Sequence, residues 1–187
     1  VAAQLRDLPR ESFKARLKAD LERKTSMTTA TVNPIREGFH TLTPYVSVRE
    51  VNQVIDFVKQ VFGAEGQIYG TGSEGGIHSE YRIGESMVMI GGGEAWRGTP
   101  RPAALHVYVK DADAAYERAL QAGAVPIRPP QDQEYGDREG SVKDVAGNHW
   151  YIGTNQSTGH APAGMRSVTP VLHPKGAADL IDFLKRA

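Results

Sequence analysis

The apolar positions between residues 38 and 92 change their period in a recognisable order. Residues 41–48 are strand-like, and a stripe at spacings of three and four then follows, formed by Val51, Val54, Ile55, Val58, Val61 and Phe62. This spacing predicts an amphipathic helix, which Gly63 ends as a left-handed cap. Short alternating segments at 66–69, 78–83 and 86–90 predict three strands. The predicted order is βαβββ.

The same order returns in the second half of the chain. A connector rich in glycine and proline, residues 91–102, leads to a predicted strand at 104–109 and a helix at 111–122, which Asp111 caps and Gly123 ends. Strands are predicted at 125–128, 140–144 and 149–153. Two half-repeats that each expose one apolar sheet face have to pack together, so we predict one α+β domain with halves at about 38–92 and 102–154.

Segments outside residues 38–154 have a different character. Pro9–Lys24 predicts a helix with Phe13, Leu17 and Leu21 on one stripe, and the Thr- and Ser-rich stretch that follows reads as a linker. We therefore interpret residues 1–37 as a helical arm with its linker, and residues 155–163 as a second linker.

The C-terminal segment repeats an earlier part of the chain. Gly164–Ala187 can be laid without a gap on Gly38–Val61 at a constant offset of 126 positions (164 − 38). We interpret residues 164–187 as the start of a second, truncated repeat. This repeat, together with a first residue that is valine, predicts that the chain is a fragment of a longer tandem protein. Apolar residues such as Ile181 are expected to be buried against another protein surface, so we expect a homodimer or a tandem second module as partner.

Composition narrows the classes of partner. The chain has 187 residues, and its 22 basic residues cancel its 22 acidic ones, so no net field attracts nucleic acid or an anionic membrane. It has no cysteine, which excludes disulfides, thiolate metal sites and cysteine nucleophiles. No apolar run approaches the roughly 20 residues of a membrane span, and the first 24 residues lack an apolar signal core. We expect a cytoplasmic protein with no nucleic-acid or membrane partner.

One glycine motif has the spacing of a phosphate-binding loop. Gly70–Gly75 matches G-x-G-x-x-G, but an alternating strand follows it where a dinucleotide fold needs a helix. A flexible hairpin turn is the favoured interpretation.

Candidate site residues lie on the predicted strands and one loop. His78 and Glu80 alternate and share a face, whereas His106 lies between apolar neighbours and is either a satisfied, partly buried histidine or a ligand-binding or acid–base group. Tyr135–Arg138 reads as a polar loop. The guanidinium group of Arg138 can donate several hydrogen bonds to an anionic group. Alternatively, Asp137 and Arg138 interact with each other within the turn. Trp150 and Tyr151 are neighbours on a strand, so one faces the core while the other can wall a pocket.

Several motifs, taken in order, resemble the vicinal oxygen chelate superfamily of glyoxalase, bleomycin-resistance and dioxygenase proteins, and within it the PhnB-like branch. They are Thr43-Pro44-Tyr45, Phe62-Gly63-Ala64-Glu65, residues 78–86, residues 105–113, Tyr135-Gly136-Asp137-Arg138 and residues 144–150. The resemblance covers about Gly38 to Thr154. It implies paired βαβββ modules that form a curved, cup-like mixed sheet, and often a dimer or an internal pair.

The metal of this superfamily has no obvious ligands here. In metal-dependent relatives a histidine opens the first strand of a half, and a glutamate follows the glycine of a D-P-x-G turn by four residues. The matching positions fall near Thr43, Ala104 and Tyr151, none of which is an ordinary ligand of a divalent cation. His106 lies two residues beyond the expected place.

The resemblance thus implies a protein that binds a small molecule in a sheet-lined pocket without the full metal site. The residues expected to bind this ligand are His78, Glu80, His106, Tyr135, Arg138 and Trp150. The alternative is a metal-dependent lyase, isomerase, thiol transferase or dioxygenase, in which His106 holds a divalent metal with Glu80 or His78. A third possibility is an interaction module whose arm and repeat serve assembly.

Overall fold

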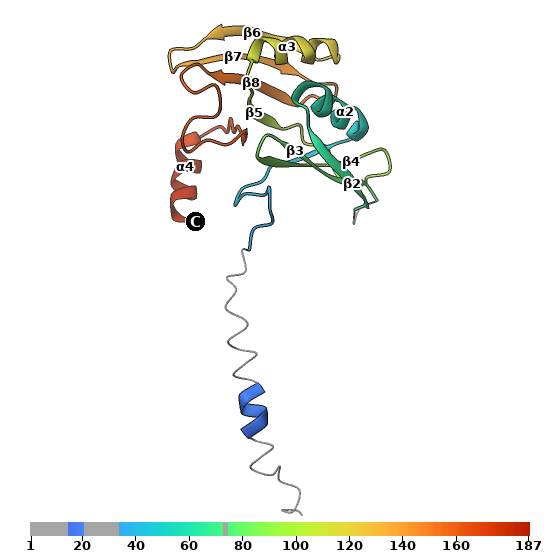
Figure 1. Cartoon of the computed structure of the whole chain (residues 1–187). Helices are drawn as coiled ribbons and strands as arrows, with labels where there is room; N and C mark the ends of the chain where they lie inside the picture. Colours follow the sequence, from blue (N-terminus) through green and yellow to red (C-terminus); the bar gives the residue numbers. More distant parts are fainter. Residues whose placement is uncertain (1–14, 21–33, 73–74) are drawn as a thin grey trace, which may run out of the picture. The chain divides into compact units, whose positions relative to one another are not determined.

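The computed structural model describes residues 15–20, 34–72 and 75–187, which fall into two compact units, Val1–Arg36 and Glu37–Ala187. In the first unit, residues 15–20 are helical (Figure 1). The remainder of the predicted Pro9–Lys24 helix lies outside the described residues.

The second unit begins with the first predicted βαβββ module. Its elements are β1 (Tyr45–Val48), α2 (Val51–Phe62), β2 (Glu65–Thr71), β3 (Ile77–Ile83) and β4 (Ser86–Gly92). They form a four-stranded sheet of order β1-β4-β3-β2, in which β1 is parallel to β4 and the other pairs are antiparallel. β2 and β3 are consecutive and pair antiparallel, with Gly70 opposite His78, so the hairpin interpretation of the glycine motif is confirmed, and its first two residues belong to β2.

The second module repeats this arrangement. It consists of β5 (Ala104–Tyr108), α3 (Ala112–Gln121), β6 (Val125–Asp132), β7 (Asp137–Lys143) and β8 (His149–Asn155). A second mixed sheet of order β6-β7-β8-β5-β9 results, with β5 parallel to β8. The α+β fold class with paired βαβββ modules is confirmed, and its strands form two mixed sheets (Figure 1).

Among the strands whose boundaries differ from the prediction, β6 and β7 differ for identifiable reasons. β6 continues through Pro129 and Pro130, because it is an edge strand whose outer side needs no backbone donors. β7 begins at Asp137, so Asp137 and Arg138 belong to a strand. The interpretation of Tyr135–Arg138 as one loop is therefore wrong for its second half.

The apolar core lies between the sheets and their helices. Alternate strand residues such as Val46, Val88 and Ile152 are fully buried and face α2 or α3, and the two helices contact each other. Trp150 is the largest fully buried side chain, and its ring centroid lies 5.6 Å from that of Phe57 and 5.3 Å from that of Phe62. This core holds the two sheets as one scaffold.

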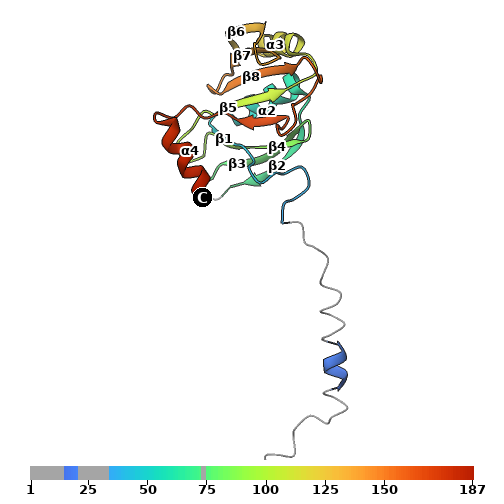
Figure 2. The same ribbon diagram turned by 90° about the vertical axis from the view of Figure 1, so that its left-hand side faces the viewer.

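A further strand and helix follow the second module. β9 (Val168–Pro170) pairs antiparallel with β5, and α4 (Ala177–Arg186) has no buried residue. Figure 2 shows α4 at one side of the unit, beside the C-terminus. α4 begins 126 positions after α2 (177 − 51), which is the offset of the sequence repeat. Within the described residues, no helix is long and apolar enough to cross a membrane.

Candidate functional site

The alternation of strand residues gives each sheet a helix side and an opposite face, which we call the open face. In the first sheet Val46, Val88 and Ile90 face the helix, so Tyr45 and Met89 face the other way. Polar and aromatic side chains gather on the two open faces, in one cluster for each sheet.

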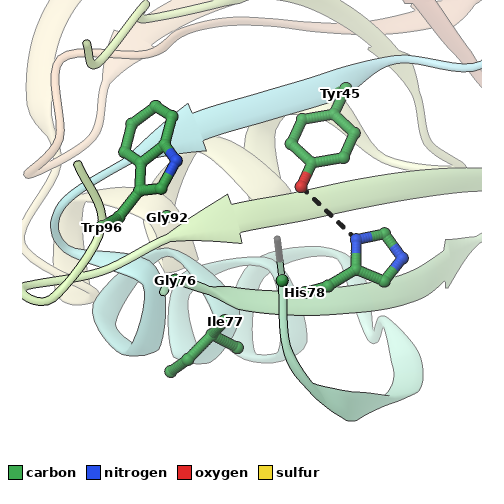
Figure 3. A pocket seen from close by; sticks show the side chains of 7 residues that line it. Tyr45, Gly76, Ile77, His78, Gly92 and Trp96 are labelled. Carbon is green, nitrogen blue, oxygen red and sulfur yellow. Dashed lines mark hydrogen bonds between the residues drawn. The ribbon is translucent and has the colours of Figure 1, made fainter. Parts of the chain in front are cut away.

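The first cluster borders a cavity of about 340 Å³. Its walls include the rings of Tyr45 from β1, His78 from β3 and Trp96 from the connector after β4 (Figure 3). The Tyr45 and His78 rings are stacked, with centroids 5.8 Å apart and an interplanar angle of 26°. The cavity is therefore an aromatic slot at the edge of the first sheet, and we call it the Tyr45 pocket.

A chain of polar contacts runs along the wall of the Tyr45 pocket. The Tyr45 hydroxyl lies 3.4 Å from Nδ1 of His78, and Nε2 of His78 lies 3.4 Å from Oε1 of Glu80. Glu80 is only 6% exposed. The prediction that His78 and Glu80 share one strand face is confirmed. Together they offer a ligand a hydrogen-bonding histidine backed by a buried carboxyl group.

Glycines make the space that the aromatic rings occupy. A Cβ at Gly91 would overlap the Tyr45 hydroxyl, and one at Gly76 would lie 2.9 Å from Cβ of Trp96. Gly92 has φ +120°, a conformation that favours glycine, and also lines the cavity. Gly92, which the sequence placed in the connector, ends β4 and is thus part of the pocket wall.

The second cluster centres on a buried carboxylate in the second sheet. Glu139 Oε2 lies 2.9 Å from Nε2 of His106 and accepts a hydrogen bond from the Tyr135 hydroxyl at 3.3 Å, while Arg128 binds Oε1. Burial by itself raises the pKa of Glu139, but the His106 hydrogen bond and the charges of His106 and Arg128 outweigh it and lower the pKa below its usual value. Glu139 is therefore an ionised group at neutral pH, and it orients His106.

A second hydrogen-bonded pair supports His106 from the side. The Tyr108 ring packs against His106 in a tilted arrangement, with centroids 4.4 Å apart and an interplanar angle of 46°, and its hydroxyl donates to Oδ2 of Asp137 at 2.9 Å. Asn155 donates to the other oxygen of Asp137 at 2.7 Å. Burial, followed by the hydrogen bond to Asp137, raises the pKa of Tyr108, so this hydroxyl remains a neutral donor. Gly153 leaves room for the imidazole, since a Cβ there would lie 2.9 Å from Cε1 of His106.

Two of the six predicted ligand residues face away from these clusters. Arg138 binds Asp113 of α3, with Nη2 2.7 Å from Oδ1, and its Nη1 lies 3.1 Å from Oδ1 of Asp132. Trp150 is fully buried, and its indole donates to Oδ2 of Asp144 at 2.9 Å. Both alternate with open-face residues on their strands, so Trp150 is the core member of its pair and Tyr151 faces outward. The expectation that Arg138 and Trp150 line a pocket is corrected.

The remaining four predicted residues fall into two separate places. His78 and Glu80 lie in the first sheet, whereas His106 and Tyr135 belong to the cluster of the second. The sequence reasoning missed their partners, listed here by cluster: Tyr45 and Trp96, then Arg128 and Glu139. Strand alternation could have identified Glu139, because it places Glu139 on the sheet face opposite to that of its neighbour Arg138.

The residues present do not fit the metal site of metal-dependent relatives. In the described stretches, no three or more His, Asp or Glu side chains are placed to hold a metal ion. The carboxylate nearest His106 is already bound by Arg128 and Tyr135. His106 also lies in a different sheet from His78 and Glu80, the substitute ligands that the alternative function requires.

Two βαβββ modules, each with a mixed sheet and one helix, define the fold class of this domain. Residues 38–152 match the model of the Glyoxalase/Bleomycin resistance protein/Dioxygenase superfamily, and the chain belongs to this family. The superfamily resemblance is thereby confirmed.

Several known proteins are similar to this chain in sequence or in structure. An uncharacterized protein of Mycobacterium bovis, Mb0911c, is 35% identical over 123 residues, which cover 60% of this chain and 81% of that protein. A glyoxalase I variant from Zea mays has a TM-score of 0.51 at 14% identity, over 63% of this chain and 44% of that one. TioX from Micromonospora sp. ML1 has a TM-score of 0.47 at 24% identity, over 61% of this chain and 98% of that one. At 14% identity, the glyoxalase I structure shows likeness of fold alone.

Proposed function

We propose that this protein binds a small organic molecule with a flat apolar portion in the Tyr45 pocket, and that binding needs no metal. The observation that carries the proposal is the cavity of about 340 Å³ walled by Tyr45, His78 and Trp96. Ligand pockets are typically about 300–1,000 Å³, apolar or aromatic, with a few polar groups that fix orientation.

The chemistry of the walls selects the ligand class. Tyr45 is 48% exposed, so a flat ring can stack on it without first opening the core. His78 adds a polar ring atom to the same wall, and Glu80 stands behind it. A ligand with an aromatic ring and one hydrogen-bonding group satisfies both features.

Metal-free bleomycin is the first probe, because the family description includes bleomycin-resistance proteins and bleomycin carries flat aromatic rings. The chain has two tryptophans, Trp96 in the pocket and Trp150 in the core, so a change in tryptophan fluorescence on titration reports on Trp96. We expect saturable binding that is unchanged by EDTA.

Matched variants test whether the Tyr45 pocket is the site. His78→Ala removes one aromatic wall, and we expect calorimetry to show affinity weakened by about tenfold, the effect of losing about 1.4 kcal/mol of contact. Lys59→Gln, on the exposed side of α2, is the control and leaves affinity unchanged. Equal affinity in His78→Ala and wild type, or binding that disappears in EDTA, contradicts the proposal. If bleomycin does not bind, flat aromatic compounds are screened by the same titration, and failure of all of them also contradicts it.

We also propose that the chain belongs to the PhnB-like branch and is built for assembly with a second module or a second copy. The ordered motifs from Thr43-Pro44-Tyr45 to residues 144–150 support the branch. α4 supports the assembly, because it begins at the offset of the sequence repeat and exposes Ile181, Phe183 and Leu184.

A further inference from the structure

A group of basic side chains lies on the open face of the second sheet, away from the Tyr45 pocket. Lys143 of β7 is paired in register with His149 of β8. The His149 ring is stacked on Tyr151, with centroids 4.1 Å apart and an interplanar angle of 17°. The Tyr151 hydroxyl lies 3.1 Å from Nε2 of His173, which follows β9. Three segments of the chain thus bring basic groups together around Tyr151.

Arg128 of β6 adds a fourth basic group. Its register partner on β7 is Ser141, which is in turn paired with Tyr151, so Arg128 lies two strands from Tyr151 in the same row. Its bond to Glu139 shows that its side chain lies on the open face. We call the set of Arg128, Lys143, His149 and His173 the basic cluster.

Two buried polar atoms of the basic cluster have no hydrogen-bond partner among the described residues. They are Nε2 of His149 and Nε of Arg128. Buried polar groups are nearly always hydrogen-bonded, because a buried group left without a partner destabilises the folded chain. Unpartnered nitrogens from two strands of one sheet face are what a ligand with several acceptor atoms would satisfy.

The charges around His149 have one dominant sign. Burial, and then the positive charges of His173, Lys143 and Arg128, lower the pKa of His149, whereas the charge of Glu139 opposes them. Glu139 is itself held by Arg128 and His106. Repulsion among neighbouring cations favours an anion that neutralises them.

We propose that the basic cluster binds a tetrahedral dianionic group, of the phosphate or sulfate class, carried by a small molecule. Four oxygens arranged tetrahedrally can accept from donors that arrive from different strands, which a planar carboxylate with two oxygens does less well. Arginine and lysine are also the side chains that bind such groups most often. This inference does not depend on the Tyr45 pocket, because the two sites share no residue.

Inorganic sulfate is the probe, because its charge stays constant between about pH 5.5 and about pH 8 while histidines titrate. Binding is followed by calorimetry and by histidine ring NMR signals of the whole chain, with chloride matching the ionic strength. We expect the His149 signals to shift and its pKa to rise on binding. Affinity should increase at least about threefold from about pH 8 to about pH 5.5, since a neutral His149 gains a proton beside the anion.

Charge-removing variants locate the site. Lys143 is exposed, so Lys143→Gln leaves the fold intact. This variant should weaken sulfate binding by at least about threefold, the effect expected from losing one partly screened charge contact. His149→Gln should do the same and remove most of the pH dependence. The control Lys59→Gln removes an equal charge from α2 and should change nothing.

Several results would overturn the proposal. They are equal sulfate affinity in Lys143→Gln and Lys59→Gln, acetate bound as tightly as sulfate, or no shift of the His149 signals at saturating sulfate. Trp96 fluorescence is recorded in the same titration, so that sulfate binding in the Tyr45 pocket is recognised if it occurs.

Discussion

Replacing Trp150 by phenylalanine separates a core role from a ligand-binding role for this side chain. Trp150 is fully buried against Phe57 and Phe62, and its indole nitrogen donates to Asp144 Oδ2 at 2.9 Å. Trp150→Phe removes that donor and part of the ring but keeps an aromatic group on the helix side of β8. We therefore expect lower stability and unchanged ligand affinity.

The size of the stability loss follows from two contributions. Shortening the ring leaves a cavity of roughly 40 Å³, which at about 24 cal/mol per Å³ costs about 1 kcal/mol. Loss of the indole donor costs about 1–2 kcal/mol more, at the low end because Asn148 still donates to the same Asp144 oxygen at 2.8 Å. The free energy of unfolding should fall by about 2–3 kcal/mol in total.

Urea unfolding followed by far-ultraviolet circular dichroism measures this loss without relying on tryptophan emission. Trp96→Phe is the matched variant, and we expect the opposite result: a smaller loss of stability and weaker binding of metal-free bleomycin. The assignment of Trp150 to the core is refuted if Trp150→Phe changes the free energy of unfolding by less than about 0.5 kcal/mol while weakening ligand binding.

Two further predictions concern Glu139 and α4. Because the pKa of Glu139 is lowered in the folded chain, its ionised form stabilises the fold above the ordinary value of 4.5, and this contribution is lost as the pH falls through the lowered pKa. Unfolding free energy should therefore fall more steeply with acid in the wild type than in Glu139→Gln, and parallel curves would contradict this. The exposed apolar stripe of α4 should drive self-association, so Ile181→Asp should lower the mass measured by light scattering at high concentration, whereas Lys185→Gln should not. A wild-type chain that is already monomeric there would refute the role of α4.

The hydrophobic periods of the chain were enough to predict its modules. Both βαβββ orders, the left-handed cap at Gly63 (φ 65°) and the Asp111 cap, which accepts from the backbone of Ala114, follow from local spacing and turn chemistry. These features depend on residues within a few positions of one another, so a single sequence carries them. The extension of β6 through two prolines was not local, because it depends on β6 being an edge strand.

The composition of the candidate sites was decided by tertiary structure. The sequence predicted that His78 and Glu80 share a face, because two positions on one strand always do. It could not show that Tyr45 stacks on His78, or that Arg128 and Glu139 hold each other beside His106, since these contacts join strands whose register is set by packing across the chain. The choice between Trp150 and Tyr151 for the core likewise required the sheet, because alternation fixes that the two differ and only burial against α2 and α3 decides which one faces inward.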